Sequence, residues 1–147
     1  MYKTIVVACD GTGPGEAALH QGGELAKLCK ADLHVLGIVV TAGGLLLDPA
    51  ILPVDLLATE RQILQTALAD AVRDLGRRGI KASTSIRDGD PAREIVTYVK
   101  DIKADLAIVG HSERGPWARW FEGSVGASLL DTLPCSLLVA IDGAPRS

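Results

Sequence analysis

Short apolar runs alternate with segments of helical period along this chain, and that alternation restricts the fold more than any other feature. Runs rich in Val, Ile and Leu are expected to form strands at Thr4 to Cys9, Leu33 to Val40, Lys81 to Ile86, Leu106 to Val109 and Ser136 to Ile141. Helical spacing of apolar residues predicts helices from about Gly15 to Cys29, from about Ala58 to Leu75, from Pro91 onward and from Ser124 to Leu130. This alternation predicts a parallel sheet covered by helices on both faces.

The order of the elements predicts an α/β fold with a doubly wound, open, five-stranded parallel sheet in the order 3-2-1-4-5. The more polar third strand, with alternating Ala82, Thr84 and Ile86, suits an edge position. In such a sheet, ligands bind outside the carboxyl ends of the strands where the winding reverses, which are the first and the fourth. The segments that follow these strands, 10–12 and 110–115, are therefore expected to meet at one ligand cleft.

Length and charge restrict the class of protein further. At 147 residues, 48% of them hydrophobic, the chain is expected to form a single domain over residues 1–147. The net charge of -3 and the scattered Lys and Arg residues argue against a nucleic-acid partner. No segment reaches the roughly 20 apolar residues of a bilayer span, so no membrane partner is expected. Cys9, Cys29 and Cys135 resemble buried thiols, and the first strand begins without a targeting leader, so we expect a cytoplasmic location.

The two glycine-rich segments do not match the common phosphate motifs. The segment 11–16 has the first two glycines of a dinucleotide fingerprint but places Glu16 where the third would stand. The segment 110–115 has the glycine spacing of a Walker A loop, yet Pro116 and Trp117 replace its Lys and Ser or Thr. Neither an NAD site nor a P-loop is expected.

Four motifs, in order, resemble the universal stress protein family over roughly Tyr2 to Ile141. They are Ala8-Cys9-Asp10-Gly11-Thr12, Gly89-Asp90-Pro91-Ala92, the run from Ala104 to Gly110, and Gly110 followed at a distance by Gly123-Ser124. ATP-binding members carry a glycine, two residues, a second glycine, nine residues and then Gly-Ser or Gly-Thr. The spacing is kept here, but Glu113 replaces the second glycine. The resemblance implies the adenine-nucleotide alpha-hydrolase-like fold.

The resemblance also implies a site for ATP or AMP, with Mg²⁺ only alongside ATP. Asp10 would accept hydrogen bonds from the adenine or ribose, and Ile38 would meet the base through its backbone. Ser124 would donate to phosphate at a helix start, although Asp10 and Ser124 could equally act as helix caps. The implied nucleotide-binding residues are Cys9, Asp10, Ile38, Val109, Gly110, Ser112, Gly123, Ser124 and Val125.

Glu113 divides the interpretation. A carboxylate about 4 Å from a phosphate opposes binding by about 4 kcal/mol at an effective dielectric constant of 20. A glutamate can also strain the backbone at a position where ATP-binding members have glycine. Together the two effects predict nucleotide binding weakened about tenfold to a thousandfold. Arg114 and Arg119 could pair with Glu113 or contact phosphate, or could simply be solvated. Three functions follow: an attenuated nucleotide-binding regulatory protein, a nucleotide-free dimeric interaction protein, and, in reserve, a slow ATPase.

Apolar segments outside the core suggest partners. The edge strand Ser136 to Ile141 offers unpaired backbone groups, and the family resemblance implies a homodimer through it; a covering tail is the alternative. The aromatic cluster of Trp117, Trp120 and Phe121 predicts either a turn packed on the core or a docking patch for a protein partner. The apolar connection from Leu45 to Val54 is expected to cover a cleft or meet another subunit.

Catalysis has little support in the sequence. Of the three histidines, only His111 stands at the predicted cleft, without an evident nucleophile or orienting carboxylate. No residues have metal-ligand spacing. The family resemblance implies a dimeric stress-response protein that binds an adenine nucleotide, and no catalytic residues are assigned.

Overall fold

The computed structural model describes residues 1–9, 13–40, 54–111, 129 and 131–141. The described strands form one parallel sheet in the order β3-β2-β1-β4-β5. They are β1 (Thr4–Cys9), β2 (Asp32–Val40), β3 (Ala82–Gly89), β4 (Leu106–His111) and β5 (Ser136–Ile141). The predicted fold class and strand order are confirmed, and β3 lies at the edge that its polar alternation indicated.

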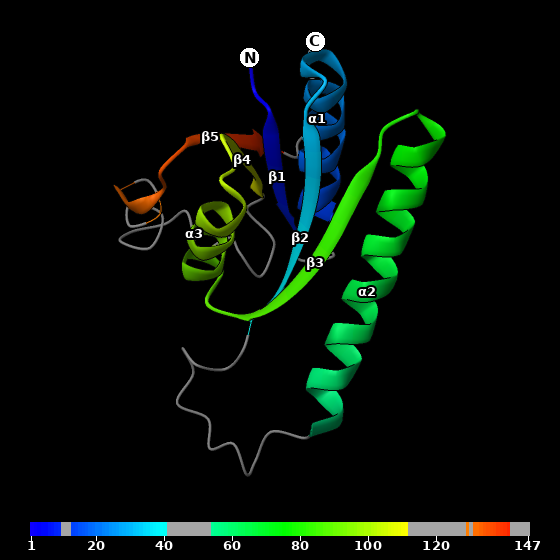
Figure 1. Cartoon of the computed structure of the whole chain (residues 1–147). Coiled ribbons are helices and arrows are strands. Elements are labelled where there is room, and N and C mark those ends of the chain that lie inside the picture. The colour runs from blue at the N-terminus through cyan, green and yellow to red at the C-terminus, as the bar shows by residue number, and fades with distance from the viewer. Residues whose placement is uncertain (10–12, 41–53, 112–128, 130, 142–147) are drawn as a thin grey trace.

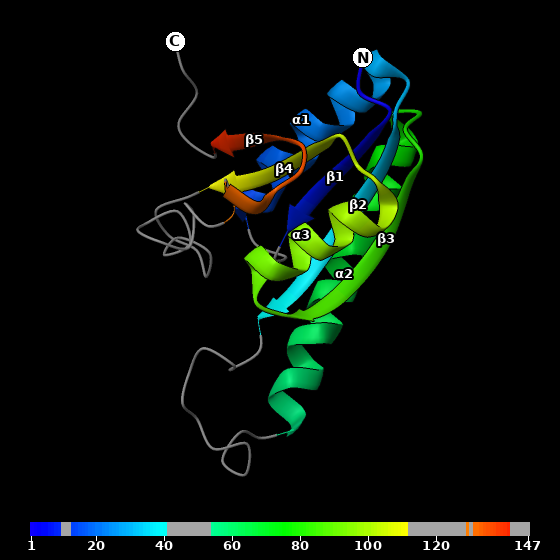
Figure 2. The ribbon, with the colours of Figure 1, turned by 60° about the vertical axis from the view of Figure 1, so that its left-hand side comes forward.

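Helices cover both faces of this sheet (Figures 1 and 2). Helices α1 (Gly13–Cys29) and α2 (Val54–Arg77) pack on one face, and α3 (Pro91–Ile102) packs on the other. Because side chains alternate along a strand, Ile5 and Val7 of β1 point into the α1/α2 core, whereas Val6 points into the α3 core. In the described part of the chain, no helix is long and apolar enough to cross a membrane.

Several element boundaries differ from the sequence-based ones. Two strands end later than expected because their backbone pairing continues past the apolar residues. β3 was expected to end at Ile86, but its backbone pairs with β2 as far as Gly89. β4 was expected to end at Val109, but its pairing with β5 carries it to His111. α2 begins at Val54, which was wrongly assigned to the preceding connection, and runs to Arg77. Of the expected helix from Ser124 to Leu130, only Leu129 lies among the described residues.

The start of α3 follows directly from its sequence. The Asp90 side chain accepts a hydrogen bond from the backbone N–H of Arg93 at 3.0 Å, and Pro91 occupies the first turn. Proline suits this position because its missing N–H would have no intrahelical partner. The expected helix start at Pro91 is confirmed.

Asp105 aligns the two strands at which the winding reverses. Its carboxylate accepts hydrogen bonds from the backbone N–H of Lys3 at 2.8 Å and of Thr4 at 3.1 Å. Desolvation raises the pKa of Asp105, but these hydrogen bonds and the nearby N-terminal charge together lower it by more. The pKa of Asp105 therefore lies below the ordinary value. The ionised carboxylate thus ties the beginning of β4 to the beginning of β1.

Candidate functional site

The backbone pairing between β1 and β4 stops before either strand ends. Within the described residues it runs from Ile5↔Leu106 to Ala8↔Val109. β1 continues with β2 to Cys9↔Gly37, while β4 continues with β5 to His111↔Ile141. The two halves of the sheet therefore part at their carboxyl edge, where the winding reverses and where open α/β sheets bind ligands.

The described candidate residues border this edge from opposite faces. The Cys9 side chain is buried in the α1/α2 core, whereas Ile38 and Val109 are buried in the α3 core. Gly110 follows Val109, is buried, and pairs with Ala140 of β5. Because the three side chains point into the two cores, these residues can reach a ligand at this edge only through their backbone groups.

β2 extends further than β1 at the same edge. Among the described residues, Ile38, Val39 and Val40 pair with β3 alone, since the pairing of β2 with β1 ends at Gly37. This side of β2 can therefore offer backbone N–H and C=O groups to a ligand. The expectation that Ile38 acts through its backbone agrees with this geometry.

The other candidates lie outside the described residues and stay predictions. They comprise the carboxylate after β1, the phosphate-loop residues, the two arginines and the aromatic cluster: Asp10, Ser112, Glu113, Arg114, Trp117, Arg119, Trp120, Phe121, Gly123, Ser124 and Val125. The apolar connection is likewise outside, apart from Val54 in α2.

Two of the three histidines make contacts with neighbouring helices. Nδ1 of His34 on β2 lies 3.3 Å from the hydroxyl of Tyr98 on α3, which in turn lies 3.1 Å from the hydroxyl of Ser85. Nδ1 of His20 on α1 lies 3.2 Å from Nη1 of Arg78. Among the residues with described side chains, no group of three or more His, Cys, Asp or Glu residues could hold a metal ion.

The thiols differ in exposure, contrary to the sequence-based expectation. Only Cys9 is buried, while Cys29 and Cys135 are partly exposed. Burial raises the pKa of the Cys135 thiol, against the smaller lowering effect of a hydrogen bond with the Ala107 backbone. Apolar neighbours in the sequence did not distinguish a strand that is central in the sheet from a helix end or a loop.

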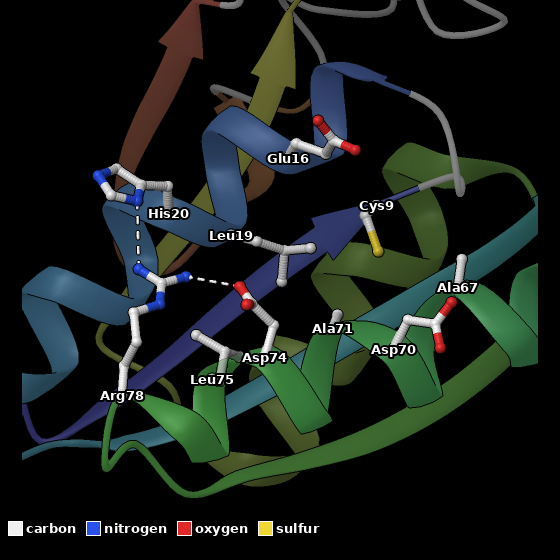
Figure 3. Close-up of a pocket in the computed structure, with 10 residues that line it drawn as sticks. All are labelled: Cys9, Glu16, Leu19, His20, Ala67, Asp70, Ala71, Asp74, Leu75 and Arg78. Carbon is white, nitrogen blue, oxygen red and sulfur yellow. Dashed lines mark hydrogen bonds and ion pairs between the residues drawn. The ribbon is translucent and has the colours of Figure 1, made fainter.

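A hollow between α1 and α2 was not anticipated from the sequence (Figure 3). It encloses about 460 Å³, with Cys9 at its floor and Ala67 and Ala71 on its α2 wall. The two alanines, one turn apart, fall within the helix expected from about Ala58 to Leu75, and the sequence indicated no role of their own for them. Their small size was the available signal, but it carries meaning only once α1 is known to lie opposite.

Comparisons with known proteins agree with this geometry. The model of the universal stress protein family matches residues 1–140. Universal stress protein MJ0531 from Methanocaldococcus jannaschii is 28% identical over 141 residues, which cover 95% of this chain and 82% of that protein.

Solved structures share the fold. Universal stress protein UspA from Lactobacillus plantarum superposes with a TM-score of 0.81 at 25% identity, covering 95% of this chain and 97% of that one. A family protein from Arabidopsis thaliana, solved with AMP bound, has a TM-score of 0.69 at 18% identity, covering 97% and 93%. Two further structures of this fold, at 20% and 19% identity, are complexes with cAMP and, from Archaeoglobus fulgidus, with dAMP.

Proposed function

The chain belongs to the universal stress protein family, and from this premise we propose that it binds an adenine nucleotide, ATP or AMP, at the carboxyl edge of β1, β2 and β4. The observation that carries the proposal is the parting of the sheet beyond Ala8↔Val109. Structures of this fold in complex with AMP, dAMP and cAMP support the choice of ligand.

The described backbone fits the base of such a nucleotide. An adenine presents hydrogen-bond donors and acceptors along its edge, and β2 beyond Gly37 offers backbone groups of both kinds at Ile38 to Val40. Cys9 at the end of β1, and Val109 and Gly110 near the end of β4, lie on the opposite side of the opening. Asp10, directly after β1, is the residue we assign to the adenine or ribose.

The phosphates are assigned to the segment that follows β4. Gly110 and Ser112 would line their path, and Gly123, Ser124 and Val125 would supply donors. Mg²⁺ accompanies ATP in this proposal, because the charge of a triphosphate near Glu113 requires neutralisation that AMP needs less. Arg114 and Arg119 are available for the same purpose.

We further propose that the protein acts in the cytoplasm as a homodimer formed through β5. This edge strand pairs with β4 alone among the described strands. Val139 is 37% exposed and Ile141 is 56% exposed, so two strands meeting edge to edge would bury apolar surface and pair open backbone groups. Bound nucleotide would then change the surface that a partner protein contacts. Trp117, Trp120 and Phe121 are the proposed docking residues for this partner.

The nucleotide content of freshly purified protein is the first test. Denaturation followed by chromatography, against a buffer blank, should release ATP or AMP. Glu113→Gly should raise affinity in direct titration by about tenfold or more if the carboxylate alone attenuates the site. If the wild type releases no nucleotide and the Glu113→Gly variant also fails to bind one, the result would favour the nucleotide-free interaction protein. This is the second candidate function because the charge of Glu113 opposes phosphate binding. Phosphate release from ATP by the same samples would reveal slow hydrolysis.

The dimer has a separate test. Val139→Lys places a charge on the open edge of β5 and should shift the sedimentation coefficient from that of a dimer to that of a monomer. Lys27→Ala on α1 is a control for changed surface charge. Monomeric wild type would exclude the proposed assembly without affecting the nucleotide proposal.

A further inference from the structure

The hollow between α1 and α2 has an apolar interior. Cys9 and Leu75 are buried beneath it, and Leu19, Ala67 and Ala71 are partly buried around it (Figure 3). Ala67 and Ala71 face α1 with single methyl groups, which leaves space that larger side chains would fill. At about 460 Å³, the hollow lies within the range of about 300–1,000 Å³ typical of small-molecule sites.

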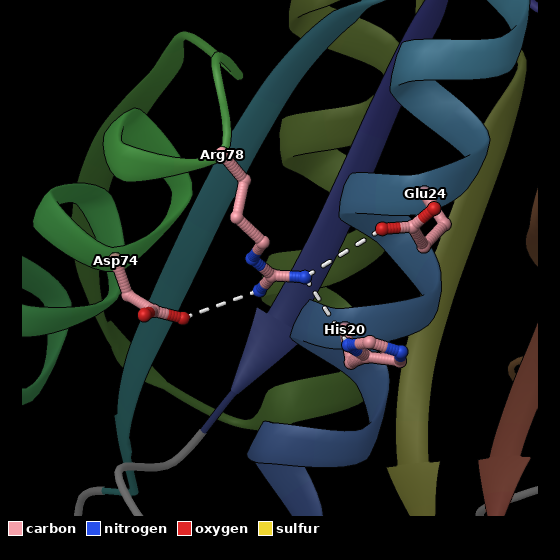
Figure 4. Close-up of polar contacts among 4 residues, drawn as sticks. All are labelled: His20, Glu24, Asp74 and Arg78. Carbon is pink, nitrogen blue, oxygen red and sulfur yellow. Dashed lines mark hydrogen bonds and ion pairs between the residues drawn. The ribbon is translucent and has the colours of Figure 1, made fainter.

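One end of the hollow is closed by Arg78, whose charge is already matched (Figure 4). Its Nη1 lies 3.2 Å from Nδ1 of His20 and 3.7 Å from Oε1 of Glu24. Its Nη2 lies 3.2 Å from Oδ2 of Asp74. These contacts tie α1 to α2 and leave the guanidinium with little capacity to attract an anion.

The other end of the hollow is acidic. Glu16 on α1 makes no ion pair with any described residue, and Asp70 on α2 is paired only with the solvent-exposed Arg73 at 3.3 Å. An ion pair at so exposed a position adds little stability, so Asp70 remains available to another cation. Besides His20, the lining residues carry three carboxylates against one guanidinium.

We propose that this hollow binds an amphipathic organic cation, an ammonium group attached to an apolar body. The ammonium lies between Glu16 and Asp70, and the body rests on Leu19, Ala67 and Ala71. A metal ion fits poorly because the floor is apolar, and an anion would meet the excess carboxylates. This site lies on the α1/α2 face and does not depend on the proposed nucleotide function.

Three probes that share a phenylethyl group separate charge from apolar contact: 2-phenylethylammonium, 2-phenylethanol and 3-phenylpropanoate. Each is titrated to about 10 mM while backbone amide shifts are followed by NMR, which detects binding with dissociation constants of about 1 mM or weaker. We expect the cation to shift amides around Glu16 to His20 and Ala67 to Leu75, with the alcohol weaker and the carboxylate weakest. Equal binding of all three, shifts elsewhere, or no shifts would overturn the proposal.

Two pairs of variants test the apolar and charged parts separately. Ala71→Leu fills the hollow and should abolish binding of the cation, whereas Ala69→Leu, on the exposed side of α2, should not change it. Glu16→Gln should weaken the ammonium probe about fivefold and leave phenylethanol unchanged, as expected for one partly solvated charge contact. Glu60→Gln is its control.

The readouts keep this site distinct from the nucleotide site. If circular dichroism shows that Ala71→Leu is unfolded, the proposal is tested by Glu16→Gln instead. The Glu16 side chain is exposed, so removal of its charge leaves the core intact. Unchanged cation affinity in Glu16→Gln, or an equal loss for the cation and the alcohol, would contradict the proposed recognition. Nucleotide content is measured on the same samples, so its absence bears only on the function at the sheet edge.

Discussion

The two faces of the sheet solve the same packing problem differently. On one face α3 lies directly on the strands, with Ile95 and Val99 fully buried and the hydroxyl of Tyr98 satisfied by Ser85 and His34. On the other face α1 and α2 share the sheet, meet each other through Arg78, and leave a hollow. Where two helices lie side by side on the sheet, small facing side chains leave space between them.

Truncating Ile95, which packs α3 on the sheet, should have the largest effect on the free energy of unfolding. Ile95→Ala is expected to lower the free energy of unfolding by about 3 kcal/mol, because it removes a fully buried side chain from a closed core. Ile63→Ala, at a residue 59% exposed on α2, should change it by about 0.5 kcal/mol or less. Urea unfolding measures both, and similar losses would contradict the described burial of Ile95 against the sheet.

Close contact of α1 with the sheet should be nearly as sensitive. A Cβ at Gly22 would clash with Val7 and lie 3.3 Å from Cδ1 of Ile108, so Gly22→Ala should destabilise by about 2 kcal/mol despite better helix propensity. At Gly76 of α2 no atom lies within 4 Å of such a Cβ, and Gly76→Ala should stabilise by about 0.5 kcal/mol. Thermal unfolding distinguishes the signs; stabilisation by both would disprove the tight contact at α1.

Asp105 provides a pH-dependent reference that belongs to the sheet and not to either face. Asp105→Asn should destabilise by about 1.5 kcal/mol at neutral pH, since two backbone N–H groups lose a charged acceptor. Because the folded pKa lies below the ordinary pKa of an aspartate, the stabilisation is present above that ordinary value and is lost as pH falls through the folded pKa. Urea titrations from pH 7 to pH 3 should show wild type and variant converging; a constant difference would exclude this origin.

The polar contacts of the two faces should differ least. Tyr98→Phe removes the hydroxyl shared by Ser85 and His34 and should cost about 1 kcal/mol, because Tyr98 is only 5% exposed. Arg78→Gln breaks contacts whose carboxylates are 52% and 63% exposed and should cost about 0.5 kcal/mol. Chemical denaturation at two salt concentrations checks this: only the Arg78 effect should fall with added salt.

Sequence reasoning performed best where the pattern is local. The apolar run of β1 and the Asp90-Pro91 start of α3 were placed correctly, because both depend on residues within a few positions of each other. The ends of β3 and β4 were placed too early, because Asp88 and His111 are polar residues held in strands by backbone pairing with a neighbour. Side-chain character cannot reveal pairing that the partner strand supplies.

For the candidate site, the sequence located the edge but not its shape. The segments 10–12 and 110–115, which follow the first and fourth apolar runs, indicated where the winding reverses, and the strand order confirms that place. That the pairing of β1 with β4 stops at Ala8↔Val109, and that β2 continues past Gly37, depends on the relative lengths and register of three strands. Those quantities arise from contacts between residues far apart in the chain.

By itself the sequence determined the family through its motifs. It also determined the strand order and the edge at which a ligand is expected, because alternating apolar patterns and right-handed connections admit few arrangements of a βα chain. Only the tertiary structure decided that Cys9 and Ile38 face opposite cores and that Ala67, Ala71, Glu16 and Asp70 surround one hollow. The reason is that a hollow is defined by what fails to fill it, and that depends on how far apart two packed helices lie.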